Sequence, residues 1–186
     1  MSSRQPGTQT ILRHWREAVP EDRLAHLVKD ATRALVRALQ MRLAEHHVSF
    51  GHWTFLRVLW EGDGLTQREL SEEAGVQEPT TFAALKAMQR LGYVERRRRG
   101  NDRKKLYVFL TPQGRALKRA LVPLAEEVNA IAARGVRKAD IATVRKVLLA
   151  LIENLAREEA AHDKRMPSTR ALVRLGMKPR RQRKAA

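Results

Sequence analysis

The sequence has no cysteine among its 186 residues. This absence excludes disulfide bonds, thiolate metal ligands and any sensing of peroxides through cysteine. Aromatic residues are also few, at 5% of the chain, as expected of a mostly helical protein. No apolar run reaches the roughly 18 residues that a membrane-spanning helix needs, and no signal-like apolar segment follows the polar start. We therefore expect a cytoplasmic protein that has no membrane partner.

Acidic residues are scarce relative to basic ones. The chain has 37 lysines and arginines against 20 aspartates and glutamates, which gives a formal net charge of +17. Such an excess favours an anionic partner, most commonly nucleic acid, although a ribosomal or membrane-surface protein shares this balance. No Ser/His/Asp arrangement, glycine-rich phosphate loop or paired-carboxylate motif stands out. We therefore predict neither an enzyme nor a bound cofactor.

The most informative part of the sequence is the segment Leu65–Thr111. Near its start, Thr66 and Glu69 form the T-x-x-E capping box of a helix, and Gly75 suits the left-handed end of that helix. A second helix begins close to Pro79, since proline in the first turn loses no intrahelical hydrogen bond. The segment thus starts with two short helices joined by a tight turn.

A basic hairpin is predicted after the second helix. Gly92 ends that helix, and residues 93–96 and 106–110 are predicted to be short strands. The stretch Arg96–Lys105 holds seven basic residues and the single acid Asp102. Two helices, a tight turn and a basic hairpin are the layout of a winged helix-turn-helix, which places its second helix in the major groove of duplex DNA.

Longer helices are predicted on both sides of this segment. Apolar residues recur at helical spacing over about Asp22–His46, His52–Glu61 and 139–162, and a further helix begins at Thr111-Pro112. The expected fold class is mainly α with a small β-hairpin wing (α+β). The predicted parts are an N-terminal extension (1–20), a helical dimerisation region (21–48 and 112–163), a winged helix-turn-helix domain (49–111) and a basic C-terminal tail (164–186).

The terminal helices carry apolar seams too extensive for a lone DNA-binding unit of three helices. Their apolar residues are spaced by three and four positions, as in helices that pack against one another. We therefore expect these helices to pair with each other and with a second copy of the chain. The residues predicted for this dimer interface are Leu24, Val28, Leu35, Ile141, Val144, Leu148, Leu151 and Leu155.

The sequence resembles the MarR (multiple antibiotic resistance regulator) family of bacterial winged-helix repressors from about Leu24 to Asn154. The most specific matches are LTQRELSEEAGV, LKAMQRLGYVERR and NDRKKLYVFLTPQGR, which occur in the family's order. The resemblance implies a dimer with interlocked terminal helices and two winged domains. The arginine that the family places two residues after Asp102 is Lys104 here, which leaves Arg103 and Lys104 as alternatives for the minor-groove contact.

The outward face of the second helix is expected to meet the bases. Thr80 can hydrogen-bond a base edge or a phosphate, while Phe82 and Ala83 can contact thymine methyl groups. Glu78 can accept from cytosine N4, and Lys86 is better placed for a phosphate. In the alternative, Phe82 is only a core residue and the wing only a flexible charged loop. The predicted DNA-contact residues are Thr66, Gln67, Arg68, Gln77, Glu78, Pro79, Thr80, Phe82, Ala83, Lys86, Arg97, Arg98, Arg99, Asp102, Arg103 and Lys104.

Phosphate contacts are expected at the start of the first short helix too. Thr66, Gln67 and Arg68 lie there, where backbone N–H groups attract anions. At the base of the wing, Asp102 can hold an arginine by bidentate hydrogen bonds. The basic tail is either a further phosphate contact or a disordered solubilising end.

The resemblance also suggests control by a small molecule, often an aromatic acid or a related CoA thioester. Aromatic walls with a few convergent polar groups suit such a ligand. The predicted ligand-binding residues are His46, Phe50, Trp53, Arg57 and Trp60. In the alternative, Trp53 and Trp60 are core residues, seven positions apart on one helix face. We predict no metal site, because the adjacent His46 and His47 point in different directions on a helix.

These features together predict a homodimeric regulator of transcription, a repressor that a small aromatic acid or acyl-CoA-type ligand releases from a pseudo-palindromic operator. The alternative is a sequence-tolerant architectural DNA-binding protein without a small-molecule inducer. In the first case random duplex competes poorly with the operator, whereas in the second it competes about equally well.

Overall fold

The computed structural model describes residues 7–17, 24–99 and 102–162. The side chains of Asp102, Arg103 and Lys104 and the predicted basic tail (164–186) lie outside the described residues. Within the described ranges no helix is both long enough and apolar enough to cross a membrane.

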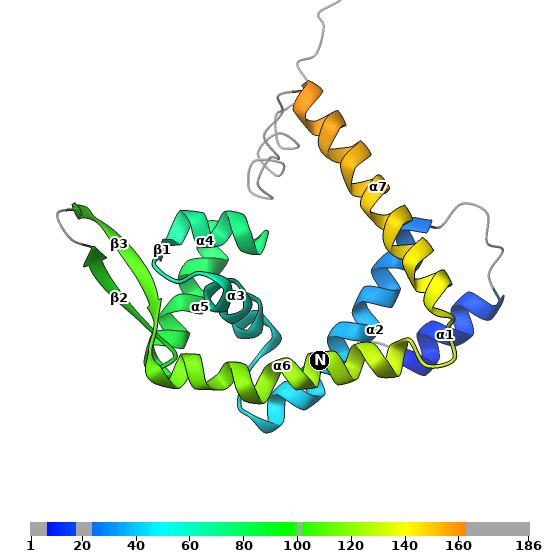
Figure 1. Cartoon of the computed structure of the whole chain (residues 1–186), viewed down its shortest axis with the longest axis horizontal. Coiled ribbons are helices and arrows are strands. Elements are labelled where there is room, and N and C mark those ends of the chain that lie inside the picture. The colour runs from blue at the N-terminus through cyan, green and yellow to red at the C-terminus, as the bar shows by residue number, and fades with distance from the viewer. Residues whose placement is uncertain (1–6, 18–23, 100–101, 163–186) are drawn as a thin grey trace, which may run out of the picture. The chain divides into compact units, whose positions relative to one another are not determined.

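The chain divides into two compact units, Met1–Arg134 and Gly135–Ala186, and the boundary falls inside the predicted dimerisation region. The second unit contains α7 (Lys138–His162). The predicted mainly helical fold with a small β-hairpin is confirmed (Figure 1). In chain order, the first unit contains α1 (Thr8–Glu17), α2 (Leu24–Glu45), α3 (Phe50–Glu61), β1 (Leu65–Thr66), α4 (Gln67–Ala74), α5 (Glu78–Arg90), β2 (Val94–Arg99), β3 (Asp102–Leu110) and α6 (Pro112–Ala132).

Local capping signals determine where several of these helices begin and end. Both halves of the predicted capping box of α4 are present, and Gly75 ends α4 with a left-handed φ of 63°. The Thr111 side chain caps α6 by accepting from the Gly114 N–H at 3.0 Å. At α3 the prediction is corrected, because the Ser49 side chain accepts from the His52 N–H and the helix therefore begins at Phe50.

The three strands form one antiparallel sheet in the order β1-β3-β2. In its register Leu65 lies opposite Val108, and Val94 lies opposite Leu110. The hairpin strands are longer than predicted, since β2 continues to Arg99 and β3 starts at Asp102. An all-arginine stretch shows no alternation of apolar and polar residues, so the sequence gives no strand signal there. The short β1 was not predicted either.

The hydrophobic core lies among α3, α4, α5 and the sheet. Leu56 of α3, Leu70 of α4 and both Leu85 and Met88 of α5 have no exposed surface, and Val108 brings β3 into the same cluster. Burying a side chain of this size contributes about 1.5–3 kcal/mol. The core therefore fixes α5 and the base of the hairpin against one rigid support.

Helix α6 joins this core to α2. Leu121 and Val128 of α6 are buried, as is Leu43 of α2. At the surface, the Arg42 guanidinium donates two hydrogen bonds to the Glu127 carboxylate, each of 3.1 Å. A bidentate pair of this kind fixes orientation as well as distance. The guanidinium holds the pKa of the Glu127 carboxyl below its usual value.

Candidate nucleic-acid interface

A buried hydroxyl pair joins the two helices of the helix-turn-helix. Thr81 of α5 is fully buried, and Ser71 of α4 donates a hydrogen bond from Oγ to Thr81 Oγ1 at 2.9 Å. The Thr81 hydroxyl in turn donates to the Gln77 carbonyl at 3.3 Å. Because both hydroxyls are satisfied inside the core, the angle between the helices is fixed by polar as well as apolar contacts.

With Thr81 turned inward, the opposite face of α5 is open to solvent. Every residue that we predicted to meet DNA from this helix is exposed: Glu78, Pro79, Thr80, Phe82, Ala83 and Lys86. The Phe82 ring is 50% exposed, so it lies outside the buried core and not within it as in the alternative. Aromatic side chains are enriched where proteins contact their partners.

The start of α4 is partly occupied by internal contacts. The Glu69 carboxylate accepts from the Thr66 N–H at 2.7 Å and from the Thr66 hydroxyl at 2.8 Å. These two donors hold the pKa of Glu69 below its usual value. The Arg68 guanidinium pairs with Glu72 at 2.9 Å, although it remains largely exposed. A phosphate at this helix end would therefore compete with two carboxylates.

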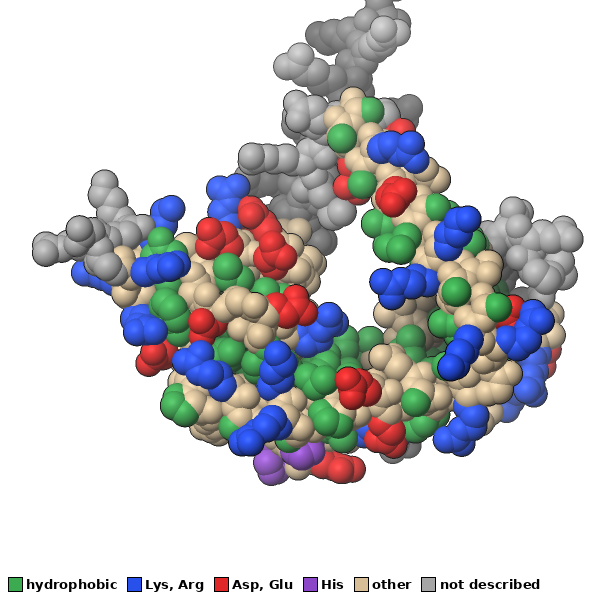
Figure 2. All heavy atoms as spheres, in the orientation of Figure 1, with side chains coloured by type: hydrophobic (Ala, Val, Ile, Leu, Met, Phe, Trp, Pro, Cys, Tyr) green, Lys and Arg blue, Asp and Glu red, His purple; other side chains and the backbone are tan. Residues whose placement is uncertain are grey.

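The wing carries its arginines in different surroundings. Arg97, Arg98 and Arg99 are exposed, and several basic side chains gather on this part of the surface (Figure 2). The Arg97 guanidinium carbon lies 4.0 Å from the centre of the Phe109 ring, and its Nε lies 3.4 Å from Glu95. Stacking on Phe109 limits the freedom of Arg97, whereas Arg98 and Arg99 extend from the strand into solvent.

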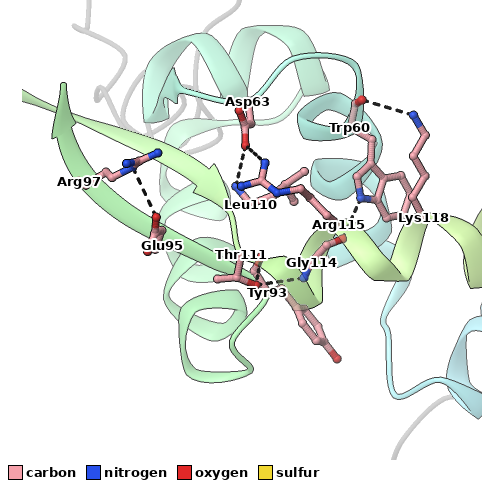
Figure 3. A network of polar contacts seen from close by, with 10 residues as sticks. All are labelled: Trp60, Asp63, Tyr93, Glu95, Arg97, Leu110, Thr111, Gly114, Arg115 and Lys118. Atoms are coloured by element: carbon pink, nitrogen blue, oxygen red, sulfur yellow. Dashed lines mark hydrogen bonds and ion pairs between the residues drawn. The ribbon is translucent and has the colours of Figure 1, made fainter. Parts of the chain in front are cut away.

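The base of the wing is anchored to α6 by residues that the sequence analysis did not single out (Figure 3). Asp63 accepts from the Leu110 N–H at 3.1 Å and from the Arg115 guanidinium at 2.7 Å. The signal that could have found Asp63 is an acidic residue between two glycines, directly after the predicted helix 52–61.

A glycine in the first turn of α6 permits the closest of these contacts. The Gly114 backbone packs directly on the Tyr93 carbonyl, and any side chain at this position would collide with it. The Thr111 hydroxyl donates to the Gly92 carbonyl at 2.5 Å. Trp60 donates from its indole nitrogen to the Gly114 carbonyl at 2.9 Å. The end of α5, the start of β2 and the start of α6 therefore form one junction.

Part of the predicted ligand set lies together beside α3. Phe50, Trp53 and Arg57 line a cavity of about 560 Å³ and also a second cavity of about 220 Å³. Trp60 lines neither cavity, because its ring packs edge-on against Trp53 and its indole nitrogen is used by α6. His46 is exposed in the turn after α2 and also lines neither.

The residues predicted for the dimer interface are mostly exposed within their own units. On α2, Leu24 and Leu35 are exposed and Val28 is half-buried. On α7, Ile141, Val144, Leu151 and Leu155 are exposed and Leu148 is half-buried. In the described residues, no cluster of three histidine, aspartate or glutamate side chains could hold a metal ion.

Comparisons with known proteins agree with this geometry. Residues 47–105 match the model of the MarR family. The HTH-type transcriptional regulator TtmR of Methylorubrum extorquens is 33% identical over 98 residues, which are 53% of this chain and 50% of TtmR. The structure of the transcriptional regulator PA3341 is 29% identical, with a TM-score of 0.65 over 72% of this chain and 98% of that one.

A further similar structure contains DNA. A MarR family transcriptional regulator from Listeria monocytogenes, solved in complex with a 26mer DNA, is 21% identical, with a TM-score of 0.68 over 80% of this chain and 100% of that one. This likeness is one of fold. The chain matches only half the length of TtmR, whereas it covers both structures almost completely. TtmR and PA3341 are both named as transcriptional regulators, which agrees with the expectation of a non-enzyme.

Proposed function

We propose that this chain, whose winged-helix segment belongs to the MarR family, is a homodimeric transcription regulator that binds duplex DNA. One observation carries the proposal: the outward face of α5 is exposed beside a hairpin that presents Arg97, Arg98 and Arg99 to solvent. The net charge of +17 gives such a surface a long-range attraction for the DNA backbone.

In the proposed complex α5 enters the major groove and the wing lies on the adjacent minor groove. Thr80 and Glu78, at the exposed start of α5, can bond base edges, while Lys86, about two turns further along, contacts a phosphate. The wing arginines suit a narrow minor groove, whose negative potential attracts guanidinium groups. Base contacts then select the sequence, whereas phosphate contacts supply most of the affinity and its salt dependence.

The exposed apolar faces of the terminal helices support a homodimer. Helix α7 exposes Val144, Leu151 and Leu155, and α2 exposes Leu24 and Leu35. Surfaces of this kind rarely stay open to water in a soluble monomer. A two-fold dimer would place two copies of α5 about one helical turn of DNA apart, on a pseudo-palindromic operator. Repression follows if that operator overlaps a promoter.

The cavities beside α3 support an effector site, and their linings indicate which ligand fits. Two carboxylates, Glu61 and Glu73, share the larger cavity with Arg57. Among the described residues, Arg57 is the one charged residue that lines the smaller cavity, and apolar side chains such as Leu39 and Val128 complete the wall. A volume of about 220 Å³ suits a small aromatic acid paired with Arg57, whereas most of a CoA thioester would extend beyond this cavity.

A thermal-shift screen of hydroxybenzoic acids and their CoA thioesters tests this effector site. A ligand at 100 times its Kd stabilises the folded chain by about 2.7 kcal/mol, so a binding acid raises Tm and weakens DNA binding in parallel. Arg57→Met should abolish both effects, whereas Arg119→Met at an exposed position of α6 should preserve them. A response that survives Arg57→Met would place the effector elsewhere.

Competition binding on selected DNA tests the proposed function itself. The full chain is used to select a site from a randomised duplex pool, and its affinity for that site is compared with its affinity for bulk non-specific duplex. A specific regulator should prefer the site by at least about a thousandfold. Arg98→Ala with Arg99→Ala should weaken binding to both DNAs and reduce the salt dependence by about one unit of slope per lost phosphate contact.

The matched control is Arg145→Ala with Lys146→Ala, which removes the same charge from exposed positions of α7. It should leave affinity nearly unchanged. A preference below about tenfold for the selected site would instead support an architectural DNA-binding protein.

A further inference from the structure

Arg96 differs from the other arginines of the wing because it turns back onto the recognition helix α5. It lies on β2 opposite Val108, and its guanidinium carbon is 5.5 Å from the centre of the Phe82 ring. Phe82 is the exposed aromatic residue of the outward face of α5. One side of a ring that is open to solvent is thus covered by a cation from the neighbouring strand.

The Arg96 guanidinium gains few polar contacts in this position. Its Nε and Nη2 atoms are shielded from solvent and have no hydrogen-bond partner among the described residues. Two unpaired N–H groups are costly to bury, and the attraction of the cation to the ring face offsets only part of that cost. The arrangement therefore contributes little to folding. Its main effect is on the orientation of the Phe82 ring.

A stacked guanidinium restricts the Phe82 ring to one orientation. On the helix surface, three of the neighbours of Phe82 three and four positions away, Glu78, Pro79 and Lys86, are exposed, whereas the fourth, Leu85, is buried. Phe82 thus lies at the side of the face that would enter the major groove. Among the base edges of that groove, thymine alone presents an apolar group, its C5 methyl.

We propose that Phe82 selects thymine by contact with the C5 methyl group, and that Arg96 is a positioning residue that holds the ring for this contact. The inference rests on the proposed function, since it requires α5 in the major groove. It goes further by naming thymine as the base that is recognised and Arg96 as the residue that positions Phe82 for the contact. The contact is apolar, so it adds specificity without another charge.

The test compares thymine with deoxyuridine, which differs from it only by lacking the methyl group. Each thymine of the site selected by the wild-type chain is replaced in turn by deoxyuridine, and affinities are measured for every duplex. Removing one buried methyl group should lower affinity roughly fourfold, which corresponds to about 0.8 kcal/mol, at one thymine per half-site. Phe82→Ala should abolish this ratio of affinities.

Arg96→Ala should also bring the thymine-to-deoxyuridine ratio close to one, because the ring is no longer held. Arg98→Ala, which removes an exposed arginine of the same strand, is the matched control. It should weaken binding to both duplexes equally and keep the ratio. Arg96→Met serves as a second variant that fills the same space if Arg96→Ala folds poorly, and it should give a ratio between those of the wild type and Phe82→Ala.

Each possible result supports or refutes one part of the proposal. A wild-type ratio near one at every thymine, or a ratio that survives Phe82→Ala, would overturn thymine reading by Phe82. A ratio unchanged in both Arg96 variants would reduce Arg96 to an ordinary basic contact. A wild-type chain that selects no sequence at all would instead refute the proposed function, and the two failures are therefore distinguishable.

Discussion

At the scale of single residues, neighbouring arginines of the wing have different physical roles. Arg96 stacks on Phe82 of α5, and Arg97 stacks on Phe109 of β3. Arg98 and Arg99 extend into solvent. Alternation along a strand accounts for part of this difference, because successive side chains point to opposite faces of the sheet. Four consecutive arginines thus include two that stack on aromatic rings and two that are exposed to solvent.

His52 supplies a residue-scale prediction about pH. It is half-buried on α3, its Nδ1 is shielded without a hydrogen-bond partner, and its ring lies edge-on 6.4 Å from that of Tyr93. Burial lowers the pKa of His52 below its usual 6.5. Below pH 6.5 the unfolded chain therefore binds a proton that the folded chain resists, so stability rises with pH across this window.

We accordingly expect Tm to fall as the pH is lowered from about 7.5 to about 5.5, and His52→Gln to reduce that fall. The change of Tm with pH is measured by thermal unfolding at several pH values, monitored by circular dichroism. His46→Gln is the matched control, because His46 is exposed. His46→Gln should show the same decrease of Tm with falling pH as the wild type. If His52→Gln shows that decrease as well, burial of His52 does not govern the pH dependence.

At the scale of elements, helix ends follow from the sequence because their signals are local. The capping box of Thr66 and Glu69, the left-handed Gly75 and the Thr111-Pro112 start all lie where predicted. Each depends on contacts between residues a few positions apart, which a single sequence displays directly. The order of helices and hairpin, and hence the winged helix-turn-helix, follows from such signals.

Elements that depend on distant partners could not be predicted in the same way. The strand β1 has two residues, and it exists because Leu65 pairs with Val108, forty-three positions away along the chain. Likewise, Asp63 acquires its role from Leu110 and Arg115, which the fold alone brings near. No short window of sequence contains both members of these pairs.

In the candidate sites too, local spacing predicts some features, whereas others depend on residues that are distant in the sequence. Phe50, Trp53 and Arg57 share one face of α3, so helical spacing sufficed to group them. The smaller cavity also needs Val128 of α6, and only tertiary packing supplies it. Similarly, the exposed face of α5 could be read from its periodicity, whereas the contact between Phe82 and Arg96 required knowing that β2 packs beside α5.

At the scale of the whole molecule, the proposed DNA binding requires two chains acting together. In the proposed complex one winged unit would contact one half-site, and the apolar residues of α7 are exposed within their own unit. Pairing two chains would bury that face and double the number of base and phosphate contacts. Affinity and operator symmetry would then have one common origin.

Sedimentation velocity of the full chain, alone and with the selected duplex, tests this central claim most directly. We predict a species with the mass of two chains in the absence of DNA, and a complex of two chains on one duplex. Leu151→Asp with Leu155→Asp, which puts charge on the exposed apolar face of α7, should yield monomers with much weaker DNA binding. A chain that sediments as a monomer at micromolar concentration and leaves duplex DNA unbound in low salt would contradict the account.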